Sequence, residues 1–414
     1  MMGDKLQLYL ITFNCALVQH DVAALSSHLL SGLESPSSSS SSPSPEPDLI
    51  VLSLQEIAPL SVAFLGGPNL TGYFEPFSTA IRTSTRKLFG QDYALVARSN
   101  VGLTGIMVFA RQPGQVASIA YAGVGVGLWE MGNKGGVGVK LNYKSVEMNF
   151  LAAHLEPHEK NARLRNDNWA AIVRGTVFDT PPTPLADDVR PVGLYSPTAH
   201  LFVLGDLNYR TSDHGPGDLE FLVFPQPTDQ QSSNKHYMNL LEHDQLSLHQ
   251  KAGKTLQGLE EAPIHFPPTY KYLVNTSSEK GPADESWNWM PLRWPSWTDR
   301  ILYLPTTPSS SAQEDIKVHR YTSIPEIQSS DHRPVVAHIS VPATPLRAAV
   351  GLRANPPFKL DPQWRGKRDA ARRREIVVGV VAYLIATWSG RAVLVAVFAG
   401  VLAGWWVLKG LTGM

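Results

Sequence analysis

The chain has little cysteine and no excess charge of either sign. Cys15 is its only cysteine in 414 residues, which excludes an internal disulfide bond. The 36 basic residues equal the 36 acidic ones, so the composition provides no general attraction to nucleic acid and argues against a dedicated nuclease. No positively charged, apolar signal segment opens the sequence, and we therefore expect the main domain to face the cytosol.

A long apolar run near the C-terminal end, Ile376 to Leu408, is interrupted only around Ser389 to Arg391. It is long enough to cross a bilayer, but a charge such as Arg391 would cost roughly 2.5 to 3.5 kcal/mol at the bilayer centre. We therefore expect a break there. Either residues 392–408 span alone, with 376–388 at the interface, or the two pieces form a short hairpin.

A cluster of basic residues directly precedes this run. Such a cluster is typical of a cytosolic flank that is attracted to anionic lipid headgroups. We predict a linker with a basic juxtamembrane cluster at 343–375, a transmembrane or membrane-embedded segment at 376–408, and a location at the endoplasmic reticulum or another endomembrane. A buried helical pair in a soluble domain is the alternative. The basic residues are Arg365, Lys367, Arg368, Arg372, Arg373 and Arg374.

Short runs of valine, isoleucine, leucine and phenylalanine recur between Leu6 and Ile339, separated by turn-forming residues, and indicate a layered α/β domain. Many connections are too short for a crossover helix, which favours mixed or antiparallel sheets packed face to face. The expected strands are 6–12, 49–54, 94–97, 105–110, 136–141, 146–152, 201–204, 300–303 and 335–339. The expected helices are 22–33, 81–89 and 160–173.

One segment inside this domain has a different composition. The serine- and proline-rich run 35–47 cannot build a packed core, so we expect a flexible surface insertion. It is no domain boundary, because candidate site residues lie on both sides of it. We therefore assign residues 1–342 to one domain.

Polar residues follow the ends of several expected strands. Asn14 and Glu56 carry oxygen ligands of the kind that Mg²⁺ prefers, although either residue alone is more often a cap or a turn residue. His154 can hydrogen-bond an anion. Asp206 and Asn208 follow the strand at 201–204, where a carboxylate and an amide can orient a water molecule for attack. An Asx turn is the alternative for this pair.

A second histidine stands just before the last expected strand. His332 follows Asp331, and Asp299 is a further carboxylate that can hold its ring. An imidazole held by a carboxylate is suited to proton transfer or to gripping a phosphoryl oxygen.

Four blocks of sequence carry a family resemblance. Residues 202–210 resemble the Gly-Asp-Leu-Asn-Tyr-Arg signature of the inositol polyphosphate 5-phosphatases, and 295–302 resemble their Pro-Ser-Trp-(Cys)-Asp-Arg-Ile-Leu signature. The blocks 132–137 and 268–272 are also similar, and the nucleases of the same exonuclease-endonuclease-phosphatase superfamily lack them. The resemblance covers Lys5 to Ile339. It implies an α/β four-layered sandwich of two mixed β-sheets flanked by helices.

The resemblance also implies a metal and a water molecule at the site. It implies one Mg²⁺ bound chiefly by Glu56, with Asn14 close by. It assigns Asp206 and Asn208 to a water molecule that attacks in line, without a covalent phosphoenzyme.

The remaining implied roles concern the phosphate groups. By the resemblance, His154 and His332 contact the scissile phosphate, and Asp299 orients His332. The residues implied to bind the rest of the substrate are Asn133, Lys134, Tyr270, Lys271 and Arg300, although a solvated surface charge is the plainer interpretation of each cation.

The sequence departs from the family pattern at a few positions. Phe13 stands where tryptophan is common, Thr298 where cysteine is common, and Ala152-Ala153 where the family has Asn-Ser. None of these changes removes a proton donor or a metal ligand. His158 competes with His154 for the catalytic position, and the spacing to Arg165-Asn166 favours His154.

These observations predict a magnesium-dependent phosphatase that removes the 5-phosphate of phosphoinositides such as phosphatidylinositol 4,5-bisphosphate at a membrane. Tethering to a lipid surface favours lipid substrates. The alternatives are a phosphatase for soluble inositol polyphosphates, a nuclease of the same superfamily, and a lipid-binding module without turnover.

Overall fold

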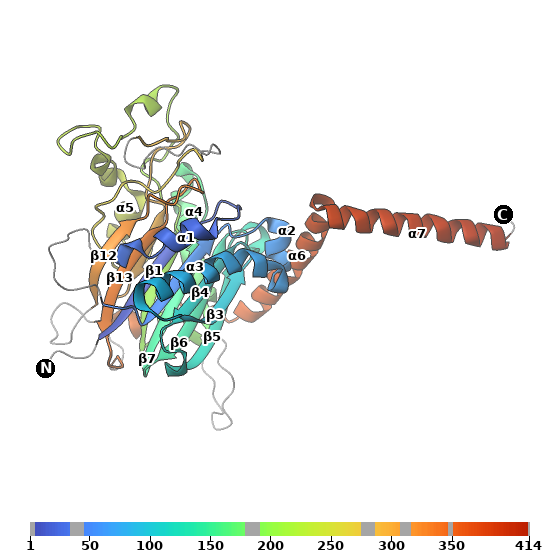
Figure 1. Ribbon diagram of the computed structural model, residues 1–414, viewed down its shortest axis with the longest axis horizontal. Helices are drawn as coiled ribbons and strands as arrows, with labels where there is room; N and C mark the ends of the chain where they lie inside the picture. The colour runs from blue at the N-terminus through green and yellow to red at the C-terminus, as the bar shows by residue number, and fades with distance from the viewer. Residues whose placement is uncertain are drawn as a thin grey trace.

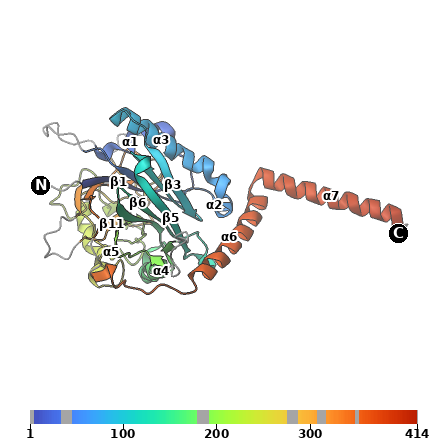
Figure 2. The ribbon, with the colours of Figure 1, turned by 90° about the horizontal axis from the view of Figure 1, so that it is seen from below.

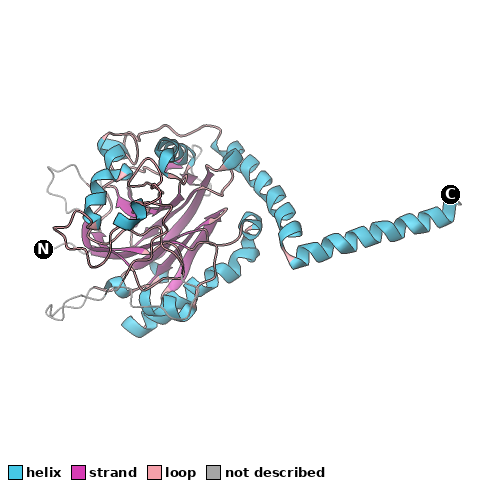
Figure 3. Ribbon diagram, turned by 90° about the horizontal axis from the view of Figure 1, so that it is seen from above, coloured by secondary structure: helices cyan, strands magenta, loops and turns pink. Residues whose placement is uncertain are grey.

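The computed structural model describes residues 5–33, 45–178, 191–274, 286–306, 316–346 and 351–412. Two large sheets pack face to face, helices cover their outer faces, and a helical extension follows (Figures 1 and 3). The predicted sandwich of two mixed sheets flanked by helices is therefore confirmed. The insertion predicted at 35–47 lies largely outside the described residues.

The first sheet has six strands in the order β12-β13-β1-β2-β4-β3. β1 and β2 run parallel, whereas the other neighbours pair antiparallel. The strands are β1 (Lys5–Asn14), β2 (Leu49–Gln55), β3 (Ala94–Val101), β4 (Thr104–Ala110), β12 (Lys317–Ser323) and β13 (Val335–Pro342).

The second sheet has five strands in the order β11-β10-β7-β6-β5. β7 and β10 run parallel, and the other pairs are antiparallel. A short antiparallel pair, β8 and β9, stands apart from both sheets. The bounds are β5 (Val116–Gly125), β6 (Gly135–Tyr143), β7 (Val146–His154), β8 (Val177–Phe178), β9 (Val192–Gly193), β10 (Ala199–Asp206) and β11 (Asp299–Tyr303).

The central strands are buried on both faces. In β1, Leu8 and Leu10 face the second sheet, while Tyr9 and Ile11 belong to the cluster under the outer helices. Strands enclosed on both sides need apolar residues at successive positions rather than at alternate ones. This explains why the continuous apolar runs of β1, β2 and β4 were recognisable in the sequence.

Helices cover both outer faces. Phe74, Phe77 and Ile81 form the buried stripe of α3 against the first sheet, at the spacing expected of one helix face. Trp169 and Ile172 of α4 cover the second sheet in the same way. The helices are α1 (Val22–His28), α2 (Leu60–Leu65), α3 (Thr71–Phe89), α4 (Ala162–Gly175) and α5 (Gln245–Lys251).

Two helices form the C-terminal part. α6 (Trp364–Ala386) lies against the domain, and α7 (Trp388–Thr412) projects away from it (Figures 1 and 2). They meet at Thr387, whose backbone is extended at φ −102° and ψ 151°. The segment Trp388–Leu411 is long and apolar enough to cross a membrane. The basic cluster expected in a linker is thus part of a helix that packs on the domain.

Candidate active site

The functional residues lie where strands of both sheets end at one edge of the sandwich. The parallel register of β1 and β2 sets Asn14 beside Gln55, immediately before Glu56. In the second sheet, Asp206 pairs with His154 on one side and with Asp299 on the other. A hydrogen bond of 2.9 Å from Asn14 Nδ2 to Asp206 Oδ2 joins the two sheets. The structure therefore brings together the strand-end residues that the sequence predicted.

Asp206 is the centre of this cluster and is only 1% exposed. Its Oδ1 accepts the Asn208 amide at 3.0 Å, and its Oδ2 lies 3.3 Å from His154 Nε2. Burial opposes its charge, but the hydrogen bond from His154 and the charge of His332 hold the pKa of Asp206 well below its usual range. The carboxylate is therefore ionised at neutral pH and suited to orienting a proton donor.

Asn208 sits in a tight turn directly after β10. Its φ of +59° lies in the left-handed region, which asparagine tolerates better than most residues. Its Nδ2 donates to Asp206 Oδ2 at 3.2 Å and to Leu155 O at 3.0 Å, while Arg210 Nη2 donates to its Oδ1 at 2.5 Å. An Asx-type turn, in which Asp206 Oδ1 accepts the Asn208 amide, is thus formed by the two residues predicted to be functional.

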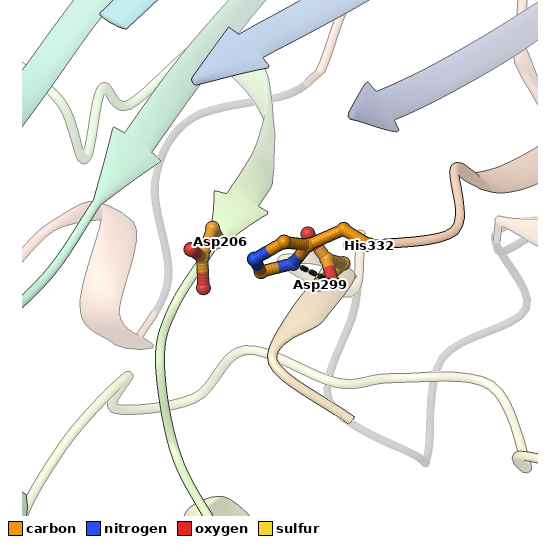
Figure 4. Close-up of side chains that lie close together, drawn as sticks. All are labelled: Asp206, Asp299 and His332. Carbon is orange, nitrogen blue, oxygen red and sulfur yellow. Dashed lines mark hydrogen bonds and ion pairs between the residues drawn. The ribbon is translucent and has the colours of Figure 1, made fainter. Parts of the chain in front are cut away.

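His332 forms a buried ion pair with Asp299. Figure 4 shows the imidazole between the carboxylates of Asp299 and Asp206, with Nδ1 donating to Asp299 Oδ2 at 2.9 Å. The same oxygen accepts the hydroxyls of Thr269 at 2.7 Å and Thr298 at 2.9 Å. Burial alone would lower the pKa of His332, but Asp299 and the neighbouring carboxylates raise it to about 10. The ring is therefore an imidazolium at neutral pH.

The pKa of His154 shifts in the opposite direction to that of His332. Its Nε2 lies 2.6 Å from Lys134 Nζ, and it is 1% exposed. Burial and the charge of Lys134 lower its pKa, so one neutral and one charged imidazole face Asp206. His158, in contrast, is exposed and lies 3.4 Å from Arg293 Nη2. This placement supports His154 as the site histidine.

Two groups of residues offer metal ligands. The side chain of Glu56 is 31% exposed and has only loose neighbours, Lys134 at 3.5 Å and His154 at 4.0 Å. Among the described residues, Asn14 Oδ1 accepts one hydrogen bond, from Ala16 N at 3.0 Å, and keeps a second lone pair. The buried amide oxygen of Asn14 and the partly exposed carboxylate of Glu56 are ligands that fit a hard divalent cation.

The second group is Asp206, Asp299 and His332, whose ligand atoms lie within 4.8 Å of one another. The protonated His332 Nδ1 already donates to Asp299, and the same carboxylate oxygen accepts two hydroxyls. A protonated imidazole cannot act as a ligand. This group therefore fits an oriented ion pair beside Asp206 better than a cation site.

Tyr270 and Lys271 border the site beside His332. The rings of Tyr270 and His332 are 4.6 Å apart, and a bridge between the two backbones holds them together. Lys271 forms an ion pair with Asp331. Burial opposes the charge of Lys271, but Tyr270 and Asp331 raise its pKa. A second cation thus stands next to the imidazolium.

The predicted substrate contact of Arg300 is wrong. Successive residues of a strand face opposite sides, so Arg300 points away from the site when Asp299 points into it. Its guanidinium is 1% exposed and is bonded to Asp244 at 3.1 Å and to Glu261. Arg300 therefore stabilises the domain.

Asn133 is half-buried, and its Oδ1 is enclosed in the protein. A Cβ on Gly127 would lie 2.0 Å from Asn133 Oδ1, so this side chain fills the turn that only glycine leaves open. Asn133 thus shapes the loop from which its neighbour Lys134 reaches the site.

Residues that support the site were not singled out in the sequence. The hydroxyls of Thr269 and Thr298 donate to the carboxylate of Asp299. The guanidinium of Arg210 donates to the backbone carbonyl and to the side-chain oxygen of Asn208. All three lie inside the blocks that resemble the family, one or two residues from a predicted site residue. Their adjacency was the available signal, but only the fold shows which way each side chain points.

Curated relatives share part of the sequence. Phosphatidylinositol 4,5-bisphosphate 5-phosphatase A of Rattus norvegicus is 33% identical over 51% of this chain and 19% of the relative. Phosphatidylinositol 3,4,5-trisphosphate 5-phosphatase 1 of Mus musculus is 28% identical over 62% of this chain and 20% of the relative. Type I inositol polyphosphate 5-phosphatase 1 of Arabidopsis thaliana is 32% identical over 54% and 34%. The chain thus matches a fifth to a third of these proteins' lengths.

Solved structures share the fold. The inositol polyphosphate 5-phosphatase domain of Spsynaptojanin, solved with inositol (1,4)-bisphosphate and calcium ion, has a TM-score of 0.58 at 22% identity over 90% of each chain. A Cimex nitrophorin has a TM-score of 0.53 at 20% identity, over 82% of this chain and 99% of that chain. Because a nitric oxide complex occurs on the same fold, the fold alone does not identify the reaction.

The family follows from the sequence matches. The named relatives confirm the resemblance to 5-phosphatases that the sequence blocks predicted. The family model described as endonuclease/exonuclease/phosphatase family 2 matches residues 11–338, which hold every candidate site residue. The chain belongs to the endonuclease/exonuclease/phosphatase family 2.

Proposed function

We propose that this protein hydrolyses the 5-phosphate of phosphoinositides such as phosphatidylinositol 4,5-bisphosphate, with Mg²⁺ and by direct attack of water. The observation that carries the proposal is the pair of cations, Lys134 and Lys271, beside the ionised Asp206 and the imidazolium of His332. Several positive groups around one reactive centre fit a ring that carries more than one phosphate. The names of the curated relatives support the same reaction.

Asp206 and Asn208 act on the attacking water. The carboxylate of Asp206 accepts a hydrogen bond from the water. The carboxylate is itself held in place because it accepts a hydrogen bond from the backbone amide of Asn208. A carboxylate of such low pKa is a weak base, so its main contribution is to orient the water for in-line attack. It takes up the proton only as the new P–O bond forms.

His332, His154 and Lys134 act on the scissile phosphate. The imidazolium of His332 carries a full charge and a proton on Nε2, while Asp299 fixes its orientation through Nδ1. Lys134 Nζ adds a second charge near His154. Positive groups that are already in place stabilise the negative charge that develops on the phosphoryl oxygens in the transition state.

Glu56, with Asn14 close by, would hold the magnesium ion. When bound, Mg²⁺ neutralises phosphate charge and makes the leaving oxygen easier to release. Tyr270 and Lys271 recognise the remaining phosphates of the ring, with Lys271 exchanging its partner Asp331 for a phosphate.

Helix α7 supports a lipid substrate. Its span Trp388–Leu411 fits the length of a bilayer core, and we propose that it anchors the protein in an endomembrane with the domain in the cytosol. An enzyme held at the surface meets lipid headgroups at high local concentration.

The test is phosphate release by the full chain in mixed micelles that contain phosphatidylinositol 4,5-bisphosphate. Release should require Mg²⁺, stop on chelation, and fall by about 10³-fold or more in Asp206→Asn. Asp167→Asn, at an exposed position on α4, is the matched control and should keep full activity.

Four results would contradict the proposal. Full activity of Asp206→Asn would exclude this centre. Magnesium-dependent cleavage of DNA without phosphate release would identify a nuclease, and lipid binding without release would identify a non-catalytic module. Release of phosphate from soluble inositol 1,4,5-trisphosphate but not from the lipid would show that the substrate is a soluble inositol polyphosphate.

A further inference from the structure

Helix α6 makes polar contacts with the end of α2. The guanidinium of Arg372 donates to Phe64 O at 2.6 Å and to Leu65 O at 2.7 Å, at the end of α2. Gly379 allows close approach, since a Cβ there would lie 3.0 Å from Phe64 Cβ. Val378 of α6 also packs against the apolar cluster that contains Phe64, and a cavity of about 350 Å³ remains beside Glu375.

The same helix is bonded to the loop that joins β5 and β6. Glu375 is 5% exposed, and its Oε1 accepts the backbone amide of Gly132 at 2.7 Å. One residue earlier, Arg374 Nη1 donates to Trp129 O at 2.8 Å. The donor Gly132 N and the acceptor Trp129 O both lie within residues 127–134. We call this segment the 127–134 loop. Figure 2 shows α6 running along this side of the domain.

Gly132 is held from two sides. Its carbonyl accepts Leu103 N at 3.0 Å from the turn between β3 and β4, and its amide donates to Glu375. A Cβ on Gly132 would lie 2.6 Å from Gly102 N, so only glycine fits between the two attachments. With Gly132 fixed, the loop has little freedom to shift.

Lys134 follows two residues later in the same loop. Its Nζ lies 2.6 Å from His154 Nε2 and 3.5 Å from Glu56 Oε1. A displacement of the loop by about 1 Å would move this ammonium away from the phosphate position and weaken catalysis.

We propose that Glu375 is a positioning residue that fixes Lys134 through Gly132, so that the helix leading to the membrane segment holds the active site in its working geometry. This inference rests on the proposed phosphatase function. It also changes the role of the basic cluster, because Arg372 and Arg374 bind backbone carbonyls of the domain. Undocking α6 from the domain would then lower activity without any change in the catalytic residues.

The experiment uses the full chain in detergent with soluble inositol 1,4,5-trisphosphate and Mg²⁺, so that access to a membrane does not affect the rate. Glu375→Leu should lose about 10-fold in kcat/KM, whereas Glu375→Gln, which keeps an oxygen acceptor, should recover most of it. Arg373→Ala, on an exposed part of α6, is the control and should match the wild type. Hydrogen exchange of the amides in the 127–134 loop should become faster in Glu375→Leu only.

A double-mutant cycle separates positioning from general stability. If Glu375 acts through Lys134, Glu375→Leu should cost little further activity in a Lys134→Ala background. Additive losses, or unchanged exchange in the 127–134 loop, would overturn the inference. If Glu375→Leu does not fold, Arg374→Ala, which removes the bond to Trp129 O, takes its place in the same cycle. A wild type without phosphatase activity would defeat the proposed function, and the exchange measurement would still decide whether α6 holds the loop.

Discussion

The pH range in which His332 stays protonated depends on one carboxylate, that of Asp299. Replacing Asp299 by asparagine keeps the size of the side chain and an oxygen that can accept His332 Nδ1–H, but removes the negative charge 2.9 Å from the ring. Thr269 and Thr298 can still donate to the amide oxygen. The substitution therefore changes mainly the charge that His332 experiences.

The magnitude follows from the pKa of His332, which rises from 6.5 to about 10 in the folded protein. This rise of about 3.5 pKa units corresponds to about 5 kcal/mol of interaction free energy that favours the protonated ring. The carboxylates of Asp299, Asp206 and Asp331 all contribute to it. If Asp299 supplies about half, the pKa of His332 in Asp299→Asn falls to about 8. At pH about 9 the wild-type ring is then mostly protonated, while the variant ring is mostly neutral.

The assay is kcat/KM for phosphate release from inositol 1,4,5-trisphosphate between about pH 6 and pH 10 with Mg²⁺, because kcat/KM reports the pKa values of the free enzyme. We expect the alkaline limb of Asp299→Asn to lie about two pH units below that of the wild type. Thr298→Val is the matched control, because it removes a hydrogen bond to Asp299 and leaves the charge in place. An alkaline limb unchanged in Asp299→Asn would refute the reasoning that this carboxylate keeps His332 protonated.

Three further outcomes follow from the structure. Lys271→Ala should raise the KM for inositol 1,4,5-trisphosphate by about 10-fold with a smaller effect on kcat, because it contacts phosphates other than the reacting one; an unchanged KM would exclude that role. Arg300→Gln should lower the free energy of unfolding by about 3 to 5 kcal/mol, since it leaves Asp244 and Glu261 buried without their cation, and chemical denaturation measures this; a stable variant with a raised KM would restore the substrate contact. A chain that ends at Ala386 should no longer sediment with membranes but should keep its rate on the soluble substrate; continued sedimentation would show that α7 is not the anchor.

The strands at the centre of the fold could be predicted because they are buried on both faces. β2 begins with four apolar residues, and both β2 and β13 are buried along their whole length. The edge strands β5 and β12 were missed. β12 carries lysine, histidine and arginine, and its residues are only partly buried or exposed, so it lacks the apolar pattern that identifies a strand.

The ends of helices were less predictable than their existence. The helix expected at 22–33 ends at His28 and resumes as a short turn at Ser31–Leu33, and α3 begins ten residues before the expected start at Ile81. The first half of α3 contains Pro76, which argues for a helix boundary when the sequence is read alone. Burial of Phe74 and Phe77 outweighs this local preference.

The candidate site was predictable where the sequence places a polar residue at the end of an apolar strand. Asp206 and His154 could be assigned in this way. Arg300 could not, because its partners Asp244 and Glu261 lie far from it in the sequence and only the fold brings them together. The hydrogen bond between Glu375 and Gly132 could not be predicted from the sequence for the same reason, because the two residues are 243 positions apart.

Identification of the product tests the central claim most directly. The full chain should convert phosphatidylinositol 4,5-bisphosphate in mixed micelles, with Mg²⁺, to phosphatidylinositol 4-phosphate and one equivalent of inorganic phosphate. Asp206→Asn should form neither product. Formation of phosphatidylinositol 5-phosphate, or equal product from the wild type and Asp206→Asn, would contradict the account.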